Sequence, residues 1–376
     1  MAKRIALLFS NFHTGGIQRV RLKLAKGFIE RGLDVDLVVI NSSGELHSRI
    51  PHGVEIIDLK AGRTLLALPS LVRYLKNHPV DVLLSSQPHI NALAVVARQL
   101  ARKSVRLVVG EHTDLGQILK YESGEQFRPY LIRLFYPHAD QILAVSQGVA
   151  ESITRGARID PRKIHVIYNP IELAILEAKS IELPTHPWLL DETIPVILAV
   201  GRLNIAKDYP TLIRAFGLLQ KKRELRLVIL GDGGERTRLE RIIAEENLDD
   251  CVALPGFVDN PYAYMSRASA FVLSSVFEGF PNALLEALAC GVPVVSTNCH
   301  SGPMEILAGG QYGALVPVGD AAAMAEAIAF ALDQPLPAAN AKARAAEFSL
   351  DIICDQYLDM LLGESQAQNY SMSHSS

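Results

Sequence analysis

The sequence predicts an α/β protein made of two doubly wound domains in series, each with a parallel β-sheet covered by helices. The first observation is length, because 376 residues favour two domains at roughly 100–200 residues each. The second is an alternation of short apolar runs with longer amphipathic segments, which is typical of βαβ units. The third is that this alternation lapses once and then starts again.

The first half of the chain contains seven short apolar runs that we predict to be strands. They are residues 4–10, 34–40, 54–59, 81–86, 106–110, 141–145 and 163–168. A helix is predicted to begin near Gly16, because apolar residues then recur every three to four positions, at Ile17, Val20, Leu24 and Phe28. Gly32 is expected to cap this helix in the left-handed conformation.

Residues 181–193 are rich in proline, show no periodicity and are expected to link the two domains. Six further strands are then predicted, at residues 196–200, 225–230, 251–254, 270–274, 292–296 and 314–317. We therefore expect an N-terminal Rossmann-like domain over 1–180, completed by a helix over 350–363, and a C-terminal Rossmann-like domain over 194–348. Because ligands bind beyond the carboxyl ends of the strands in such sheets, the two domains are expected to face each other across one cleft.

The composition places the chain among soluble globular proteins, since hydrophobic residues make up 49% and charged residues 20%. No signal-peptide pattern is present at the start, and no stretch approaches the roughly 20 apolar residues that span a bilayer. The four cysteines lack the paired spacing of a zinc site and are too sparse for a secreted scaffold. Reduced thiols and a cytoplasmic location are expected.

The two halves of the chain differ in net charge. Residues 1–180 contain 24 Lys and Arg against 16 Asp and Glu, an excess of +8, whereas residues 181–376 contain 13 against 24, an excess of −11. A basic first half suggests an anionic partner. The alternative is a chance distribution of surface charge.

Two loops have the composition of phosphate-binding turns. Gly15 and Gly16 lie between a predicted strand and a predicted helix, where bare backbone N–H groups can approach a diphosphate. A tight turn without a ligand is the alternative, and the absence of a G-x-G-x-x-G pattern at this strand argues against a nicotinamide enzyme. In the second half, Arg202 and Lys207 follow a strand that ends at Gly201, and two cations there suit a pyrophosphate. Two solvated loop cations are the alternative.

The segment 275–295 contains the strongest motif. Pro281 and Gly291 are expected to bound a short helix that is apolar on every side except at Glu286. Such a helix is expected to be buried, and a buried carboxylate needs a partner, either ligand hydroxyls or an arginine. Glu278 precedes this helix, eight positions from Glu286. That separation is roughly 12 Å of helical rise, against about 5–9.5 Å between glycosidase carboxylates, so two binding roles are favoured over a hydrolase pair.

The spacing Glu278-x7-Glu286, preceded by Gly201-Arg202 and Lys207 and followed by GVPVVS from Gly291, resembles the nucleotide-sugar site of family 4 retaining glycosyltransferases. The resemblance implies two Rossmann-like domains of GT-B type, with Glu286 on the ribose hydroxyls and Glu278 on the transferred sugar. It also implies that Arg202 and Lys207 hold the diphosphate. The remaining residues implied to contact the donor are Gly15, Gly16, Phe257, Val258, Gly279, Phe280, Pro281 and Asn282.

His112 matches the family histidine near the donor sugar, although a histidine at a strand end can also be structural. His112, Glu278, Arg202 and Lys207 are the residues implied to take part in the transfer step. No metal and no cofactor are expected, because the cations and helix amides would neutralise the leaving diphosphate. Asp34 and Asp36 imitate a D-x-D metal motif, but they begin a predicted strand and are expected to be solvated.

The resemblance implies transfer of a hexose or N-acetylhexosamine to a glycan or a polyprenyl- or lipid-linked acceptor in cell-envelope polysaccharide or glycolipid synthesis. A UDP-sugar is the expected donor, because residues 301–307 resemble bacterial members that use UDP-linked sugars. The alternatives are a nucleotide-sugar epimerase of the same fold and a nucleotide-sugar binding protein without turnover. No nucleic acid partner is expected.

The first predicted helix carries five cations, at Arg19, Arg21, Lys23, Lys26 and Arg31. Anionic lipid attracts such cations by about 1 kcal/mol each near the surface. We therefore expect this helix to place the protein on the inner face of the cytoplasmic membrane, as a peripheral protein. Cations that merely keep the domain soluble are the alternative.

Overall fold

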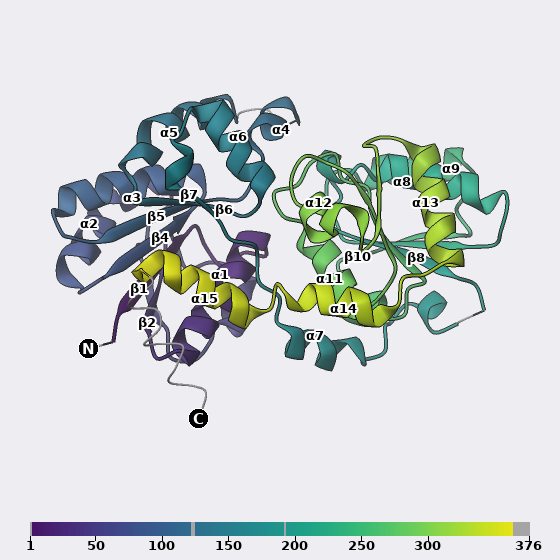
Figure 1. Cartoon of the computed structure of the whole chain (residues 1–376), viewed down its shortest axis with the longest axis horizontal. Helices are drawn as coiled ribbons and strands as arrows, with labels where there is room; N and C mark the ends of the chain where they lie inside the picture. The colour runs from purple at the N-terminus through teal and green to yellow at the C-terminus, as the bar shows by residue number, and fades with distance from the viewer. Residues whose placement is uncertain (1, 122–124, 192, 364–376) are drawn as a thin grey trace. The chain divides into compact units, whose positions relative to one another are not determined.

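The computed structural model describes residues 2–121, 125–191 and 193–363 and divides the chain into two compact units. Unit 1 comprises Met1–Pro170 and Leu350–Ser376, and unit 2 comprises Ile171–Ser349. Each unit is an α/β domain with a parallel sheet between layers of helices (Figure 1). The described part of the chain contains no helix that is long and apolar enough to cross a membrane.

The described residues of unit 1 form a seven-stranded sheet in the order β3-β2-β1-β4-β5-β6-β7. Its strands are β1 (Arg4–Phe9), β2 (Asp34–Val39), β3 (Glu55–Asp58), β4 (Val82–Ser86), β5 (Arg106–Glu111), β6 (Gln141–Ala144) and β7 (Ile164–Val166). All neighbouring strands are parallel, and in the central pair Ile5 lies opposite Val82. The strand order reverses between β1 and β4, which is where doubly wound sheets bind ligands.

Helices cover both faces of this sheet. Helices α1 (Gly16–Glu30) and α15 (Leu350–Leu362) lie on one face (Figure 1). The other face carries α2 (Leu68–Asn77), α3 (Pro88–Ala101), α5 (Arg128–Phe135) and α6 (Gln147–Ala157), and α4 (Leu115–Tyr121) packs on α6. Helix α1 ends at Glu30, and Gly32 follows at φ +76°, as the glycine pattern predicts.

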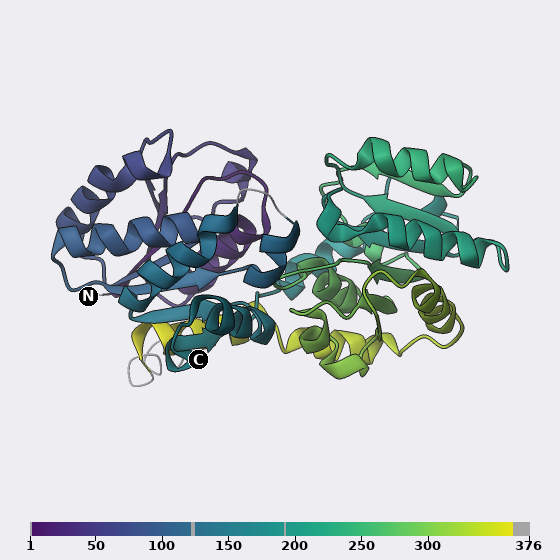
Figure 2. The ribbon, with the colours of Figure 1, turned by 90° about the horizontal axis from the view of Figure 1, so that it is seen from above.

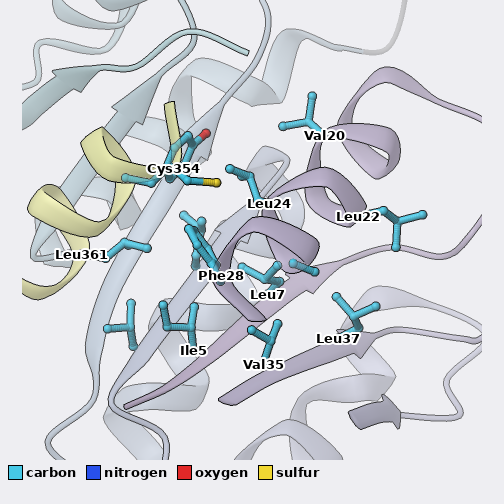
Figure 3. Close-up of a cluster of buried hydrophobic side chains, with 14 of the residues drawn as sticks. Ile5, Leu7, Val20, Leu22, Leu24, Phe28, Val35, Leu37, Cys354 and Leu361 are labelled. Atoms are coloured by element: carbon cyan, nitrogen blue, oxygen red, sulfur yellow. The ribbon is translucent and has the colours of Figure 1, made fainter. Parts of the chain in front are cut away.

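Helix α15 completes the core of unit 1 although it is far from the rest of that unit in sequence. Its Cys354 and Leu361 point toward Phe28 of α1 (Figure 3), and all three side chains are buried. The contact is close at Gly27, where a Cβ atom would lie 2.4 Å from Cys354 Sγ. Arg31 of α1 binds Asp355 at 2.9 Å, so an ion pair lies beside the apolar contact.

Unit 2 has a six-stranded parallel sheet in the order β10-β9-β8-β11-β12-β13 within the described residues. Its strands are β8 (Val196–Val200), β9 (Arg226–Leu230), β10 (Val252–Gly256), β11 (Ala270–Leu273), β12 (Val294–Thr297) and β13 (Ala314–Val316). Helices α8 (Tyr209–Gln220), α9 (Arg236–Glu245) and α13 (Ala321–Asp333) pack together on one face. The other face carries α7 (Leu173–Ser180), α10 (Tyr262–Met265), α11 (Asn282–Cys290) and α14 (Ala338–Ala346), with α12 (Pro303–Ile306) against α11.

The chain leaves unit 1 ten residues earlier than the proline pattern predicts. Ile171 donates its N–H to the carbonyl of Phe348 at 2.9 Å, and α7 packs on α10 and α11. Residues 171–180 therefore belong to unit 2, where the sequence placed them in the first domain. Figure 2 shows the ribbon from above, with the yellow α15 against unit 1.

Candidate active site

The site residues of unit 2 lie where its strand order reverses, between β8 and β11. The loop after β8 runs from Gly201 to α8, and the loop after β11 runs from Ser274 to α11. The two loops are joined by hydrogen bonds, since Val276 N donates to the carbonyl of Ala206 at 2.8 Å and Ser274 Oγ donates to the carbonyl of Lys207 at 2.6 Å. Both loops are thus fixed at the place where parallel α/β sheets bind ligands.

Lys207 and Glu278 form an ion pair between these two loops. Lys207 Nζ lies 2.5 Å from Glu278 Oε1, and Ser275 Oγ donates to the same oxygen at 2.7 Å. The two charged side chains are mostly buried, with 18% and 14% of their surface exposed. Arg202 is exposed and has no ion-pair partner among the described residues. The positive charge that remains uncompensated at this point is therefore the Arg202 guanidinium.

Gly201 allows the side chain of Lys207 to lie close to the backbone. A Cβ atom at Gly201 would lie 2.9 Å from both Lys207 Cε and the hydroxyl of Tyr209. That hydroxyl is buried and has no hydrogen-bond partner. Burial and the nearby Glu278 carboxylate raise the pKa of Tyr209, so the phenol stays neutral. A neutral buried hydroxyl can still donate to a ligand oxygen.

Helix α11 begins after Pro281 and ends at Gly291, whose φ of +79° confirms the predicted left-handed cap. Glu286 is half-buried on this helix, and the hydroxyl of Tyr262 donates to its Oε1 at 3.3 Å. The prediction of a fully buried helix was wrong. Its less covered face carries Ala283, Glu286 and Cys290, which are three and four positions apart. Glu286 therefore keeps access to solvent.

The segment before α11 is largely buried. Phe280 is buried, and its ring lies 5.9 Å from the ring of Phe348. Gly279 and Pro281 are also buried, while Asn282 is half-buried. The side chains of Phe280 and Pro281 are therefore turned into the protein, and that of Asn282 keeps partial access to solvent.

The two residues implied to border the base follow β10, the edge strand of the sheet. Phe257 exposes 60% of its surface, and Val258 is half-buried. Both follow the carboxyl end of β10, at the same edge of the sheet as the loops after β8 and β11. Among the described residues, neither forms a hydrogen bond with the side chain of Arg202, Lys207 or Glu278. The structure therefore places them on the expected edge without bringing them into the ion-pair cluster.

In unit 1 the predicted residues lie at the corresponding place, between β1 and β4. Gly15 has extended backbone at φ −160°, and α1 begins at Gly16. A pocket of about 370 Å³ lies beside Ile17 of α1. Its other lining residues come from α3 and its N-cap, the end of β5 and α5, namely Gln87, Pro88, His89, Glu111, His112, Thr113, Phe127, Arg128 and Leu131.

Glu111 anchors one wall of this pocket. Its Oε1 accepts from Arg128 Nη2 at 2.7 Å and from the backbone N–H of His112 at 3.0 Å. Its Oε2 accepts from the hydroxyl of Tyr136 at 3.0 Å. Because both carboxylate oxygens are occupied, Glu111 holds Arg128 and His112 in place and is not available as a base.

His112 and Gln87 each bring a buried polar atom to the pocket. His112 Nε2 and Gln87 Oε1 are buried and lack hydrogen-bond partners. Gln87 has a positive φ of +79°, which is strained for a residue with a side chain. Unused polar atoms and backbone strain at one place are typical of a ligand site.

The cationic face that the sequence predicted on α1 is largely absent. Arg21 is fully buried, and Arg31 is mostly buried and paired with Asp355. Lys23 Nζ donates to the carbonyl of Pro170 at 3.3 Å, and Lys26 lies 4.0 Å from Glu30. Two of the five cations, Arg21 and Arg31, are withdrawn from the surface where α15 packs on α1, whereas Arg19, Lys23 and Lys26 are half-buried.

The apparent D-x-D motif is also structural. Asp36 is buried, where it binds Arg4 at 2.9 Å and Tyr74 at 2.5 Å, so the expectation that it is solvated was wrong. Asp34 is exposed, as expected. Across the described residues, no cluster of three or more metal-ligating side chains is present.

Sequence reasoning missed the residues that hold the predicted ones. Ser275 and Tyr262 bind the two glutamates, and Glu111 with Arg128 forms the pocket wall in unit 1. Ser275 precedes Glu278 by three positions and could have been suspected from that spacing. The others come from distant segments and leave no local signal.

The two doubly wound parallel sheets and the similarity to solved glycosyltransferase structures show that the fold is of GT-B type. A family model for glycosyl transferases group 1 matches residues 181–348, and a model for glycosyltransferase family 4 matches residues 14–175. The chain belongs to glycosyltransferase family 4.

Relatives agree with this assignment. The chain is 34% identical over 374 residues to the Campylobacter jejuni N-acetylgalactosamine-N,N'-diacetylbacillosaminyl-diphospho-undecaprenol 4-alpha-N-acetylgalactosaminyltransferase, covering 96% of this chain and 100% of that one. It is 33% identical to the Escherichia coli lipopolysaccharide 1,6-galactosyltransferase, over 48% of this chain and 49% of the relative. The crystal structure of Anabaena HepE in complex with UDP superposes with a TM-score of 0.78 at 22% identity, covering 96% and 99% of the two chains.

Proposed function

We propose that this protein is a retaining glycosyltransferase that moves a hexose or N-acetylhexosamine from a UDP-sugar to a lipid-linked glycan in cell-envelope synthesis. The observation that carries the proposal is the Lys207–Glu278 pair at the strand reversal of unit 2, with Arg202 in the same loop as Lys207 and Glu286 on the helix that follows Glu278. The name of the Campylobacter relative supports a diphospho-undecaprenol acceptor. The complexes of HepE with UDP and UDP-glucose support a UDP-sugar donor.

The charged groups of unit 2 have separate roles in this proposal. Arg202 binds the diphosphate, with Lys207 beside it as a second cation that Glu278 partly neutralises. Glu286 accepts hydrogen bonds from the ribose hydroxyls, and Glu278 contacts the transferred sugar. As the bond from the anomeric carbon to the diphosphate breaks, charge develops on the leaving oxygen and these cations stabilise it. The acceptor hydroxyl attacks from the same face and gives its proton to the leaving phosphate.

The reaction needs no metal under this proposal, because Arg202 and Lys207 supply the positive charge that a metal would otherwise bring to the diphosphate. The pocket of unit 1 takes the sugar end of the acceptor. Its volume of about 370 Å³ holds one hexose with water, and its wall offers the hydrogen-bonding groups of His112, Gln87 and Arg128. Sugars are recognised by such directed polar groups.

The decisive experiment is a panel of sugar nucleotides incubated with the protein, with and without EDTA. Slow hydrolysis of one donor is expected, and it should continue in EDTA. The chosen donor is then supplied with a polyprenyl-diphosphate-linked glycan, and NMR of the product should show the anomeric configuration of the donor retained. If the donor is epimerised and no sugar is transferred, the protein is an epimerase and the proposal is wrong. If EDTA abolishes activity and only manganese or magnesium restores it, the metal-free step is refuted.

Glu278→Gln provides the site control for this assay. The variant keeps the shape of the side chain but removes the charge that faces Lys207, so donor hydrolysis should fall with the fold intact. A hydrolysis rate equal to that of the natural protein would mean that the activity comes from elsewhere.

A membrane surface is part of the proposal, and its place is α5 rather than α1. Phe127, Tyr130 and Leu134 lie three and four positions apart and expose 75%, 71% and 63% of their surface. Arg133 is exposed on the same helix, and Lys120 is exposed at the end of α4. Aromatic and apolar side chains with neighbouring cations are typical of helices that lie in the interface of an anionic membrane. Phe127 also lines the unit 1 pocket, so a lipid-bound acceptor would enter close to the bilayer.

Liposome co-sedimentation tests this surface. Binding should require anionic lipid, weaken with salt, and be lost in Phe127→Ser/Tyr130→Ser. Leu65→Ser is the control, because Leu65 is an apolar residue of unit 1 with 83% exposure that lies outside α5. Equal recovery of the natural protein with neutral and anionic vesicles would overturn the membrane proposal and leave the glycosyl transfer untouched.

A further inference from the structure

Arg21 is a charged residue in an unusual place, on the buried face of α1. None of its surface is exposed, and Nε donates to Ser86 Oγ at 2.9 Å. Its Nη1 atom is buried without a hydrogen-bond partner, and no carboxylate pairs with it among the described residues. A buried cation without a counter-ion costs several kcal/mol. Arg21 therefore lowers the stability of the fold relative to an apolar residue at the same position.

Gly110, the penultimate residue of β5, brings this guanidinium next to His112. A Cβ atom at Gly110 would lie 3.1 Å from Arg21 Nη2 and 3.2 Å from His112 Nε2. Both nitrogens thus lie against the bare Cα of Gly110, and Arg21 Nη2 also donates to Ser86 Oγ. Any side chain at this position would enter the space between them.

This arrangement dictates how the imidazole carries its proton. A guanidinium only donates hydrogen bonds, so the nitrogen that faces it is favoured in the form with a free lone pair. His112 Nε2 is buried and has no partner among the described residues, and His112 also lines the pocket. We therefore assign Nδ1 to the pocket side of the ring. Burial, Arg21 and Arg128 also hold the pKa of His112 well below its ordinary value.

We propose that Arg21 is a positioning residue that keeps His112 neutral and protonated on Nδ1, so that the ring presents an N–H donor to an oxygen of the sugar in the unit 1 pocket. The proposal rests on the function proposed above only for the identity of that ligand. Arg21 itself does not line the pocket and acts through the histidine.

The other charged and titratable groups around His112 do not reverse this effect. They come from its own segment, from α3, from α5 and from the turn after α5, namely Glu111, Asp114, His89, Arg128 and Tyr136. Glu111 is engaged by Arg128 and Tyr136, and Asp114 Oδ1 accepts from the N–H of Gly116 at 2.9 Å. Tyr357 of α15 lies near Arg21, where burial raises the pKa of the phenol and keeps it neutral.

The test is the titration of His112 observed by NMR in protein labelled with ¹⁵N-histidine. Long-range ¹H–¹⁵N spectra distinguish the two nitrogens of a neutral imidazole, and the His112→Gln variant assigns the signal. The natural protein should carry its proton on Nδ1 and titrate well below an ordinary histidine. In Arg21→Met the pKa of His112 should rise, because one of the cations that lower it is removed. A proton on Nε2 in the natural protein, or the same titration in both proteins, would overturn the proposal.

Matched variants separate positioning from structure. Arg21→Met should fold, because an apolar residue of similar volume replaces a buried charge at little or no cost. Arg21→Lys retains the charge and should restore a low pKa of His112. Lys26→Met removes a cation from the exposed part of the same helix and should leave the titration unchanged.

Turnover gives a second readout. Transfer to the lipid-linked acceptor by Arg21→Met should acquire a severalfold loss between pH 7.5 and pH 5.5 that the natural protein and Lys26→Met lack. A pH profile identical to that of the natural protein would contradict the proposal. Absence of hydrolysis of every sugar nucleotide would instead refute the proposed function, whereas the NMR titration would still decide the role of Arg21.

Discussion

The two units share a sheet order and differ in how they place charge at the point where that order reverses. In unit 2 Lys207 is paired with Glu278, both are slightly exposed, and Arg202 lies free at the surface of the described chain. In unit 1 Arg128 is paired with Glu111, but Arg21 is completely buried and has no carboxylate. Topology therefore sets where a ligand site lies, while the balance of charges sets what that site does. In unit 2 the exposed Arg202 can bind an anion, whereas in unit 1 the buried Arg21 can only orient a neighbouring hydrogen-bonding group.

The largest effect is expected from the charge pair of unit 2. Lys207→Met removes a cation from the diphosphate and leaves Glu278 without its partner, so kcat should fall by about 10²–10³-fold. Lys222→Met removes an exposed lysine of the same unit and is the control. If both variants turn over at similar rates, unit 2 does not stabilise the leaving group through this pair.

A smaller effect is expected from the carboxylate on α11. Glu286→Gln should weaken UDP binding by about tenfold or more, since hydrogen bonds to a charged group contribute about 1.5–3 kcal/mol. Tyr262→Phe removes the donor that orients Glu286 and should weaken binding by no more than about tenfold. Isothermal calorimetry measures both. If Glu286→Gln binds UDP as tightly as the natural protein does, Glu286 does not bind the ribose hydroxyls.

The smallest effect concerns the helix that follows the first strand of each unit, α1 and α8. Gly27 of α1 has no room for a side chain, because its Cβ would lie 2.4 Å from Cys354 Sγ, whereas the nearest atom to a Cβ at Gly217 of α8 is 3.6 Å away. Gly27→Ala should therefore lower the free energy of unfolding of unit 1 by about 1–3 kcal/mol. Gly217→Ala should be neutral or stabilise by up to about 1 kcal/mol.

Thermal unfolding of the two glycine variants measures this difference. Adding Cys354→Ala to Gly27→Ala should recover part of the loss, since it removes the sulfur that the new methyl group would contact. Equal unfolding temperatures for Gly27→Ala and Gly217→Ala would show that α15 adjusts to the extra atom.

Much of the fold could be predicted from the sequence because strands and helix caps depend on residues that are close together in the chain. Each strand predicted from an apolar run is present, with its ends shifted by at most a few residues, and Gly32 and Gly291 cap helices as predicted. The unit boundary was placed incorrectly because a proline-rich segment indicates irregular structure. It does not show where residues stop contacting one unit and begin to contact the other. The bond between Ile171 and Phe348 joins residues that no local pattern connects.

The site could be predicted only in part, for the same reason. Glu278, Glu286, Arg202 and Lys207 lie in loops and a helix whose spacing is visible in the sequence, and the structure brings Lys207 and Glu278 together. Arg21 was counted among surface cations, because helical periodicity does not show that a helix from the far end of the chain covers this face. Nothing in the sequence around Gly110 indicates that a guanidinium and an imidazole both lie against this glycine.

The return of α15 to unit 1 bears on how the chain folds as it is made. About 180 residues separate Pro170 from Leu350, and a ribosome adding about 5–20 residues per second needs tens of seconds to span them. During that interval the apolar side of α1 around Phe28 (Figure 3) lacks the cover of α15. Residues Ile171–Ser349, in contrast, emerge as an uninterrupted piece with its own core. Unit 2 is in effect an insertion within unit 1. The order of folding is therefore expected to run opposite to the order of synthesis, with the first-made unit completed last.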